Sequence, residues 1–198
     1  TSRLVREGII PAAKPMTVNV ISGYTGGGNG LIEEFQAQPS EITNDAFRTY
    51  GLTLSHKHVP EMTRYSGLDR APVFAPSVGR YAQGMLVEVP LHLWALPGTP
   101  TPKQLREALA DFYQGERFVS VATEAETATL QKERAGAGGY VEELDPEAMN
   151  NTNNMKLFVF GNEVTQQARL VALLDNLGKG ASGAAVQNLN IALGLEES

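Results

Sequence analysis

The chain has 198 residues, of which 42% are hydrophobic, 19% are charged and none is cysteine, and its formal net charge is −6. This length fits one domain with a substantial core, the apolar content excludes a disordered chain, and the acidic balance argues against a nucleic-acid or anionic-membrane binder. No apolar run reaches the roughly 18 residues of a membrane span, and the lack of cysteine excludes disulfides, cysteine–zinc sites and thiol catalysis within this chain.

The first residues predict the end of a helix followed by a strand. Leu4 and Val5, with Gly8 after them, are typical of a last helical turn and its C-cap. Because so short a helix is not stable by itself, we expect the rest of it to lie upstream of Thr1. Residues 16–22 alternate in polarity and are rich in β-branched side chains, which predicts a strand.

The remaining chain predicts further strands and a few helices. Pro90, inside one of the strands, indicates an edge or a bulge. The expected strands are residues 50–55, 73–78, 84–94, 118–121 and 155–161, with another apolar run at 168–174. The expected helices are residues 60–67, 101–112 and 180–193, with a polar loop and a helical piece at 124–140.

The order of these elements predicts an α+β fold, because strands and helices do not alternate as they would in a doubly wound parallel sheet. The neighbouring strands 73–78 and 84–94 resemble a hairpin, which indicates antiparallel pairing. We therefore expect one domain over residues 1–198, with a mixed, largely antiparallel sheet and helices on one face.

Five glycines lie among residues 23–30, directly after the first strand. The segment lacks the Lys-Ser/Thr pair of a Walker loop, so it is not a nucleotide loop of that kind. Because glycine costs backbone entropy, its density indicates that this backbone closely approaches a ligand or another backbone. An irregular turn is the alternative.

Two of the three histidines lie in the segment His56-Lys57-His58-Val59-Pro60-Glu61. If this segment extends a strand, His56 and His58 point to the same face, and Glu61 can hydrogen-bond a ring nitrogen. Such a group is typical of a general acid–base site, and it also suits a metal site if a third ligand such as His92 lies nearby. Solvated polar residues at a strand end are the alternative.

Residues 178–183 match the pattern G-x-G-x-x-G between an apolar run and a helix. A dinucleotide-binding fold needs a second strand and an acidic residue about 20 positions later, so we do not expect a Rossmann fingerprint here. Close approach to an anion and a tight loop that packs the helix both remain open. In that helix, Asn188 and Asn190 either recognise a carboxamide or form a polar face.

Three stretches that follow in this order, residues 18–28, 56–61 and 180–190, resemble one enzyme family. They are similar to N-acetyl-gamma-glutamyl-phosphate reductases, the semialdehyde dehydrogenases of arginine biosynthesis. Residues 79–85 are most similar to the shorter, second type of that enzyme. The three motifs span most of the chain, and their joint order is far more specific than any one motif.

The resemblance implies a two-domain oxidoreductase. An N-terminal Rossmann domain binds NADP, and a catalytic α+β domain resembles the C-terminal domain of glyceraldehyde-3-phosphate dehydrogenase. The enzyme reduces N-acetyl-glutamyl phosphate to N-acetyl-glutamate semialdehyde through a cysteine thioester and hydride from NADPH. The resemblance further implies a cytoplasmic homo-oligomer, a dimer or tetramer, that binds neither nucleic acid nor membranes.

The resemblance also implies roles for individual residues, with no metal. His58 acts as the acid–base group, and Glu61 orients it. Substrate contacts are expected from Ser22, Gly23, Tyr24 and His56. Cofactor contacts are expected from Gly180, Gly183 and Asn188.

The chain departs from this family because it contains neither the nucleophilic cysteine nor a Rossmann half. The resemblance therefore implies a catalytic and dimerisation domain that begins just after the nucleophile, with helix 180–193 packing toward the missing domain. We expect the isolated chain to be inactive. A metal-binding domain and a non-catalytic oligomerisation domain are the alternative functions.

Overall fold

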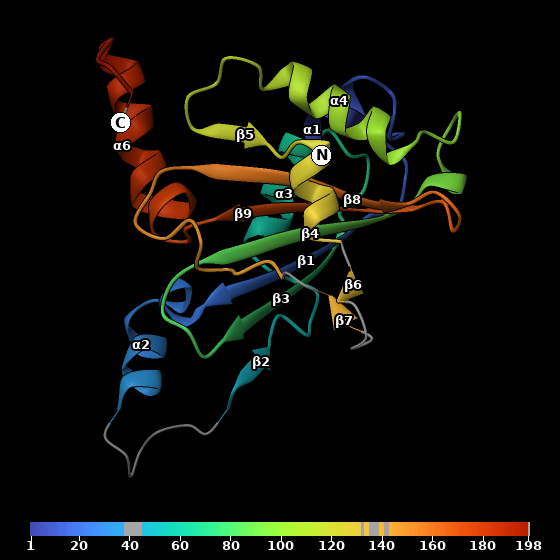
Figure 1. The fold of residues 1–198 in the computed structure, drawn as a ribbon. Coiled ribbons are helices and arrows are strands. Elements are labelled where there is room, and N and C mark those ends of the chain that lie inside the picture. The colour runs from blue at the N-terminus through green and yellow to red at the C-terminus, as the bar shows by residue number, and fades with distance from the viewer. Residues whose placement is uncertain (38–44, 132, 135–138, 141–142, 198) are drawn as a thin grey trace.

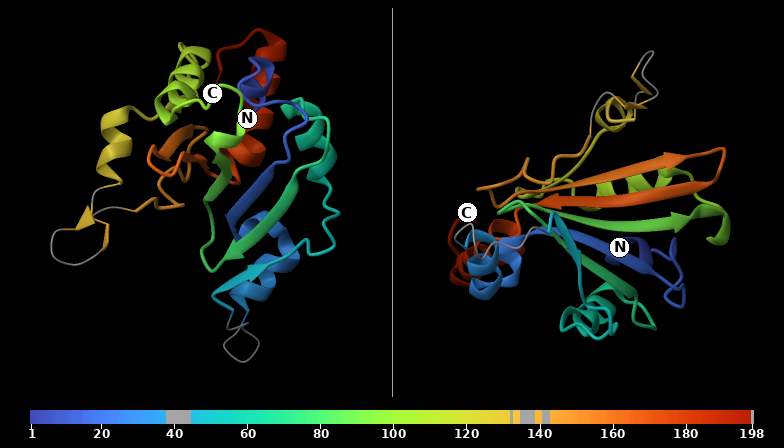
Figure 2. Two further views of the ribbon diagram at one scale, coloured as in Figure 1. Left: turned by 90° about the vertical axis from the view of Figure 1, so that its right-hand side faces the viewer. Right: turned by 90° about the horizontal axis from the view of Figure 1, so that it is seen from below.

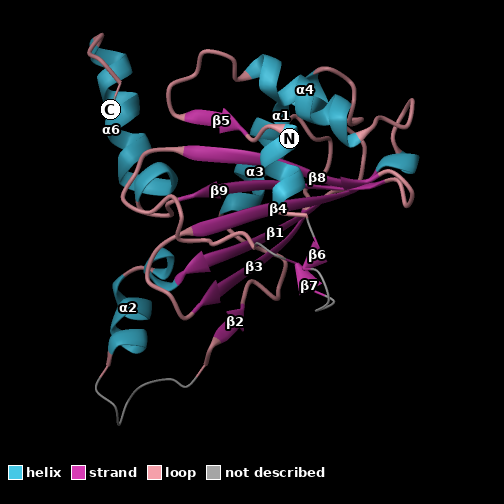
Figure 3. Ribbon diagram, in the orientation of Figure 1, coloured by secondary structure: helices cyan, strands magenta, loops and turns pink. Residues whose placement is uncertain are grey.

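The computed structural model describes residues 1–37, 45–131, 133–134, 139–140 and 143–197. Figure 1 shows one curved sheet with helices around it, and Figure 3 distinguishes helices from strands by colour. Across the sheet the strands are β2 (Phe47–Thr49), β3 (Val73–Gly79), β1 (Thr17–Gly23), β4 (Met85–His92), β9 (Gln167–Leu174), β8 (Met155–Asn162) and β5 (Val119–Val121). A separate two-stranded ladder joins β6 (Glu133–Arg134) and β7 (Gly139–Tyr140).

The sheet is mixed and largely antiparallel, which confirms the predicted fold class. β1 pairs with β3, and β5 with β8, in parallel. The pairs β2–β3, β1–β4, β4–β9 and β8–β9 are antiparallel. β9 is paired along its whole length with β4 on one side and with β8 on the other, and β4 is the middle strand of the seven.

The predicted hairpin between strands 73–78 and 84–94 is wrong, because β1 lies between β3 and β4. Residues 80–84, which connect β3 to β4, pass over the end of β1 and bond to it. The N–H of Gly23 donates to the carbonyl of Gly84 at 2.9 Å, and the N–H of Tyr24 donates to the carbonyl of Tyr81 at 2.9 Å. A short connection usually joins paired strands, but this one is long enough to span two strand spacings of about 4.8 Å each.

Residues 50–55 form turns rather than the predicted strand, and β2 lies just before them. Gly51 and Leu54 have φ values of 68° and 57°, which an extended strand does not allow. Pro90 lies in a central strand, but the pairing of β4 with β1 ends at Glu88. Pro90 therefore has no ladder partner on the β1 side, as predicted for a local edge.

Three helices pack on one face of the sheet, as Figure 2 shows: α1 (Ser2–Arg6), α3 (His58–Ser66) and α4 (Pro102–Phe112). The main core lies beneath them. Leu4, Ile10 and Leu105 are fully buried there, against Leu91 of β4 and Leu170 of β9. The predictions of helices at 60–67 and 101–112 are confirmed.

Helix α4 begins at its predicted cap. The Oγ1 of Thr101 accepts the N–H of Gln104 at 3.2 Å, and the Gln104 side chain accepts the N–H of Thr101 at 2.8 Å. Pro102 occupies the first helical position, where its missing N–H costs nothing. This reciprocal cap explains why the helix was predictable from the sequence.

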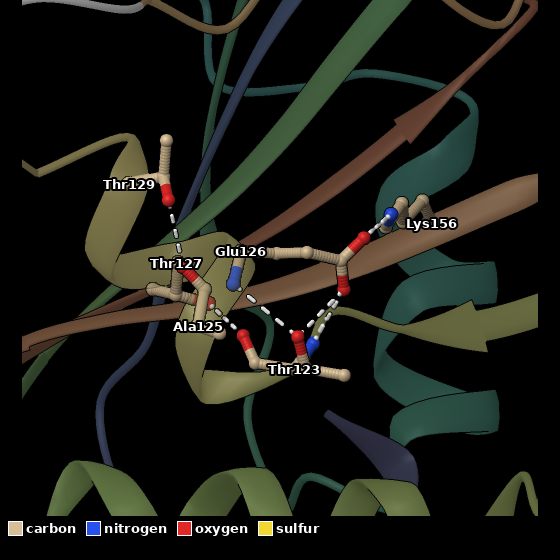
Figure 4. A network of polar contacts seen from close by, with 6 residues as sticks. All are labelled: Thr123, Ala125, Glu126, Thr127, Thr129 and Lys156. Carbon is tan, nitrogen blue, oxygen red and sulfur yellow. Dashed lines mark hydrogen bonds and ion pairs between the residues drawn. The ribbon is translucent and has the colours of Figure 1, made fainter.

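Helix α5 (Glu124–Thr129), in contrast, lies against the opposite face, beside a second core cluster that includes Phe158 and Val171. Figure 4 shows how α5 is attached to β8. The carboxylate of Glu126 accepts a hydrogen bond from the Lys156 ammonium and another, at 2.8 Å, from the N–H of Thr123. The bond from Lys156 first, and those from Thr123 after it, lower the pKa of Glu126 to about 2.

A 3-10 turn (Leu93–Ala95) follows β4, and four further helical segments gather at the other end of the sheet (Figures 1 and 2). They are a 3-10 turn (Tyr24–Gly27), α2 (Asn29–Gln36), a π-helical turn (Gly178–Ser182) and α6 (Gly183–Leu193). No sequence pattern predicts α2. Helix α6 matches the helix predicted at 180–193, but its apolar side chains are not buried: Val186, Leu189 and Ile191 are 49%, 57% and 53% exposed. No helix within the described ranges has the length and apolarity that crossing a bilayer requires.

We expect Leu105→Ala to lower the free energy of unfolding by about 2–5 kcal/mol, because it leaves a cavity at a fully buried position. Leu52→Ala is the matched control, because it is the same substitution at a side chain that is 81% exposed. Urea unfolding of both variants measures the difference. Equal losses would contradict the placement of α4 over the core.

Candidate functional site

The histidine motif forms a turn and the start of a helix. His56 lies in the turn, and His58 is the first residue of α3. The two rings lie edge to face, with centroids 4.9 Å apart. The prediction that strand alternation aligns them is wrong. Their proximity comes from the turn instead, and Pro60 fits the first turn of the helix because its N–H is not needed there.

His56 lies in a partly buried aromatic setting. Its ring is 5.0 Å from Phe74 of β3 and 5.9 Å from Tyr50, and its Nδ1 accepts the backbone N–H of His58 at 3.3 Å. Burial first, and then the charges of His58 and Lys57, lower the pKa of His56 below its usual 6.5. His56 is therefore neutral near pH 7. The bond to Nδ1 assigns its proton to Nε2, which makes Nε2–H a donor.

His58 and Glu61 are both exposed at the start of α3. Within the described ranges, no hydrogen bond or ion pair joins Glu61 to His58, so the orientation of His58 by Glu61 stays a prediction. An exposed imidazole can exchange a proton with a bound molecule, which keeps the acid–base interpretation open.

The metal interpretation needs a third ligand near the two histidines. His92 lies instead at the end of β4, with its ring 5.5 Å from that of Trp94. In the part of the chain that the structure describes, no three His, Cys, Asp or Glu side chains are arranged to hold a metal ion.

The glycine-rich loop approaches other protein backbone closely. A Cβ at Gly23 would lie 2.5 Å from the carbonyl oxygen of Ala82, so any larger residue would displace residues 80–84. Ser22 is buried, and its Oγ donates to the carbonyl of Gly23 at 3.1 Å. Tyr24 is partly exposed and stacks on Phe35 of α2 at 5.1 Å. Of the three predicted substrate residues in this loop, Tyr24 alone therefore presents a side chain to solvent.

The predicted cofactor glycines lie at the same end of the sheet. A Cβ at Gly178 would collide with the carbonyl oxygen of Thr152, and one at Gly183 would lie 2.7 Å from the Oδ1 of Asn153. These contacts confirm the interpretation of this segment as a tight loop. Gly180 is exposed on the same loop. Asn188 is exposed on α6, so both of these residues are accessible to a ligand.

Two buried polar residues that no sequence pattern predicts directly follow β9. Asp175 is 1% exposed and Asn176 is 7% exposed. Burial raises the pKa of Asp175, but hydrogen bonds from Leu177, Asn151, Gly178 and Gln83 outweigh it, so the net pKa is lowered. Polar residues at the end of an apolar strand are common in sequences, and no local signal marks these two as buried.

The predicted site residues form two groups rather than one. His56 contacts β3 at Phe74, which pairs with Val18 of β1, whereas Ser22 lies four residues further along β1. At about 3.3 Å per residue, the strand position that contacts His56 lies about 13 Å along β1 from Ser22. Within the described ranges, no hydrogen bond or ring contact joins the two groups.

Comparison with known proteins supports the motif-based resemblance. Residues 2–176 match the family described as semialdehyde dehydrogenase, dimerisation domain. The chain is 50% identical to N-acetyl-gamma-glutamyl-phosphate reductase 2 of Nostoc sp. over 98% of this chain and 59% of the relative. It is 48% identical to N-acetyl-gamma-glutamyl-phosphate reductase of Brucella anthropi over 94% of this chain and 57% of the relative. The resemblance is confirmed, and the chain spans less than two thirds of these relatives' length.

Solved structures share the fold at low sequence identity. The aspartate semialdehyde dehydrogenase of Francisella tularensis superposes with a TM-score of 0.61 at 12% identity, over 97% of this chain and 60% of that one. Aspartate semialdehyde dehydrogenase II of Vibrio cholerae gives a TM-score of 0.56 at 15% identity, over 97% and 59% of the two chains. At these identities the likeness shows the fold alone.

We expect His56 to titrate below 6.5 in a proton NMR titration, because burial and two neighbouring positive groups disfavour its charged form. The unfolded chain then binds a proton before the folded one, so this residue's stabilising contribution is lost as pH falls below 6.5. Lys57→Gln raises the pKa of His56, whereas Lys103→Gln on α4 leaves it unchanged. Titration of His56 at or above 6.5 would refute this account.

Proposed function

Because the chain belongs to the semialdehyde dehydrogenase dimerisation-domain family, we propose that it is the catalytic and dimerisation part of an N-acetyl-gamma-glutamyl-phosphate reductase. The complete enzyme reduces N-acetyl-glutamyl phosphate to N-acetyl-glutamate semialdehyde with NADPH, as a step of arginine biosynthesis in the cytoplasm. The observation that carries the proposal is 50% identity to such a reductase over 98% of the chain. His58, exposed beside a neutral His56, provides the matching chemistry.

The proposed reaction divides its groups between this chain and the rest of the enzyme. A thiolate from outside this chain displaces phosphate from the acyl phosphate and forms a thioester. NADPH, when bound, supplies the hydride that reduces this thioester. The hydride adds to the carbonyl carbon, and the oxygen, which gains negative charge, takes a proton from an acid. The same group takes that proton back as the carbon–sulfur bond breaks, which releases the aldehyde and the thiolate. His58 serves as this acid, because it is exposed at the start of α3.

Two neighbouring residues, His56 and Glu61, are proposed to assist His58. Neutral His56 donates from Nε2–H to a substrate oxygen, while its Nδ1 stays bonded to the backbone N–H of His58. Glu61 lies three residues after His58 on α3, and therefore on the same side of the helix. From that position its carboxylate can fix the tautomer and orientation of the imidazole once the substrate is bound.

The loops at the sheet end are proposed to meet the substrate and the cofactor. Tyr24 faces the substrate, while Ser22 and Gly23 set the course of the loop that carries it. The exposed backbone at Gly180 and the exposed amide of Asn188 fit the nicotinamide end of NADP, since both can be approached from outside. Gly183 allows α6 to start close to Asn153, which keeps this surface in place.

The remaining two fifths of the relatives' length is proposed to hold the Rossmann domain, with α6 packed against it. Val186, Leu189 and Leu193 recur at helical spacing on α6 and are 49%, 57% and 63% exposed. Apolar side chains in such a row need a partner surface, and the domain that binds the cofactor is the partner proposed.

A second copy of the chain is proposed to cover the face of the sheet opposite α1, α3 and α4. A cleft of about 610 Å³ lies on this face, between the sheet and the segments around α5. Leu86, Phe160 and the Glu88–Arg169 ion pair line it. Phe160 and Arg169 are of residue types that are enriched at protein interfaces, which favours this face as the interface.

The experiment that tests this function measures NADPH-dependent reduction of N-acetyl-glutamyl phosphate by the full-length enzyme. We expect His58→Ala to lower kcat by about 10²–10⁴-fold, the usual effect of removing a general acid. His56→Ala is expected to lose less, and His92→Ala, a change at the far end of β4, to lose nothing. The isolated chain is expected to show no turnover.

Several outcomes would count against the proposal. Equal losses for His56→Ala and His58→Ala, or an active His58→Ala, would remove His58 from the acid–base role. A full-length protein that does not reduce the acyl phosphate would favour a non-catalytic oligomerisation domain. Bound metal in the purified protein, lost together with His58, would favour the metal-binding alternative.

We expect the full-length enzyme to be a dimer or tetramer in solution by light scattering. Ala75→Arg is expected to shift it toward the monomer, because Ala75 is an exposed residue of β3 on the proposed dimer face. Val164→Arg is the matched control, since Val164 is 94% exposed and lies between β8 and β9. An unchanged mass for Ala75→Arg would move the interface to another surface.

A further inference from the structure

Two residues of the three-residue connection between β9 and the π-helical turn have no role in the proposed function. Asp175 and Asn176 are buried polar residues at the end of the sheet where the proposed substrate and cofactor loops meet. Burying a carboxylate and an amide is unfavourable unless each finds hydrogen-bond partners. The identity of those partners shows what the two side chains hold together.

Asp175 binds three separate segments through its carboxylate. Its Oδ1 accepts the N–H of Leu177 at 2.8 Å, at the start of the π-helical turn. Its Oδ2 accepts the N–H of Asn151 at 2.8 Å and the Nε2–H of Gln83 at 2.8 Å. The N–H of Gly178 also donates to this carboxylate. One charged group therefore connects the cofactor loop, the asparagine turn at 150–154 and the crossing loop at 80–84.

Asn176 extends the same network to the glycine-rich loop. Its Oδ1 accepts the N–H of Gly84 at 2.7 Å, and its Nδ2 donates to the Oγ1 of Thr25 at 2.9 Å. The Thr25 hydroxyl donates in turn to the carbonyl of Ala82 at 2.6 Å. Thr25 directly follows the proposed substrate residue Tyr24, and it is 151 positions from Asn176 in the sequence.

The loops joined in this way have little room to move independently. Gly23 lies against the backbone of Ala82, and Gly178 lies against the carbonyl of Thr152. The N–H of Gly180 also donates to the backbone carbonyl of Asp175 at 2.8 Å. Breaking one bond of the network should therefore loosen segments that are distant in sequence, and not merely the loop where the change is made.

We propose that Asp175 and Asn176 are positioning residues that hold the substrate loop and the cofactor loop in one fixed relative geometry. This inference rests on the proposed function for the identity of the two loops. The distance over which hydride is transferred depends on how those loops are placed, and a misplacement of about 1 Å can cost about 10²-fold in rate. Neither residue needs to touch the substrate, the cofactor or a reacting atom.

The test uses the hydroxyl of Thr25 in the full-length enzyme. Thr25→Val keeps the shape of the side chain but removes the bonds to Asn176 and Ala82, while Thr25→Ser keeps the hydroxyl and is the matched control. We expect Thr25→Val to speed amide hydrogen exchange at Asn151 and Gly180 in mass spectrometry, and Thr25→Ser to leave it unchanged. Unchanged exchange in Thr25→Val, or equal effects of both substitutions, would overturn the proposal.

Turnover provides the second measurement. We expect Thr25→Val to lower kcat by about 10²-fold with unchanged NADPH affinity, and to raise the isotope effect with deuterated NADPH, because hydride transfer becomes slower. A purely structural role would not move the isotope effect. Normal kcat and a normal isotope effect in Thr25→Val would contradict the positioning role.

A second variant provides the same test if Thr25→Val does not fold. Gln83→Met removes the donor to Asp175 with little change of volume, and the Gln83 carbonyl still accepts from the side chain of Asn150. The same changes in exchange and isotope effect are expected. If the unmodified enzyme does not reduce the acyl phosphate, the proposed function fails, and the exchange measurement alone still decides whether the network couples these loops.

Discussion

The insertion of β1 between β3 and β4 is the constraint on which the rest of the structure depends. It forces residues 80–84 to cross the end of β1, where their backbone lies against Gly23. Gly84, with a φ of 110°, then turns into β4 beside Pro146, and a Cβ there would collide with the Pro146 carbonyl oxygen. Three chain segments are thus stacked at one end of the sheet, and the cost of their close approach explains the glycines found there.

The parallel strands β1 and β3 separate the candidate site residues into two groups. Phe74 supports His56 at one level, and the glycine-rich loop leaves β1 about 13 Å further along, at about 3.3 Å per residue. Strands in the middle of a sheet do not shorten or bend easily, so this separation is a fixed property of the domain. The proposed reaction therefore needs a substrate and a cofactor that together reach both groups.

The predictability of each element follows from how local its signal is. Helix α4 was predictable because Thr101 and Gln104 cap it within four residues, and β1 because its side chains alternate. The position of β1 between β3 and β4 was not predictable, because pairing depends on contacts distant in sequence. The turns at 50–55 were missed because nothing in the sequence marks the positive φ of Leu54.

The candidate site follows the same rule. The histidine motif identified the right segment, because its spacing is local, but its geometry was wrong, since the turn and helix bring the rings together instead of a strand. Asp175 and Asn176 were missed altogether. Their burial results from four segments that meet only in the folded chain, and a polar pair after an apolar strand has the same appearance in sequence whether it is buried or solvated.

Helix α6 turns a polar side chain toward its own domain and exposes apolar ones. Its polar side faces the chain: Gln187 accepts from the side chain of Asn153 at 3.1 Å and donates to Glu197 at 2.7 Å. Its apolar side, with Leu189 57% exposed and Leu193 63% exposed, faces away. An ordinary surface helix buries its apolar stripe in its own core. This outward apolar row is the feature behind the proposed packing of α6 on the cofactor-binding domain, and the network around Asp175 holds the turn from which α6 starts.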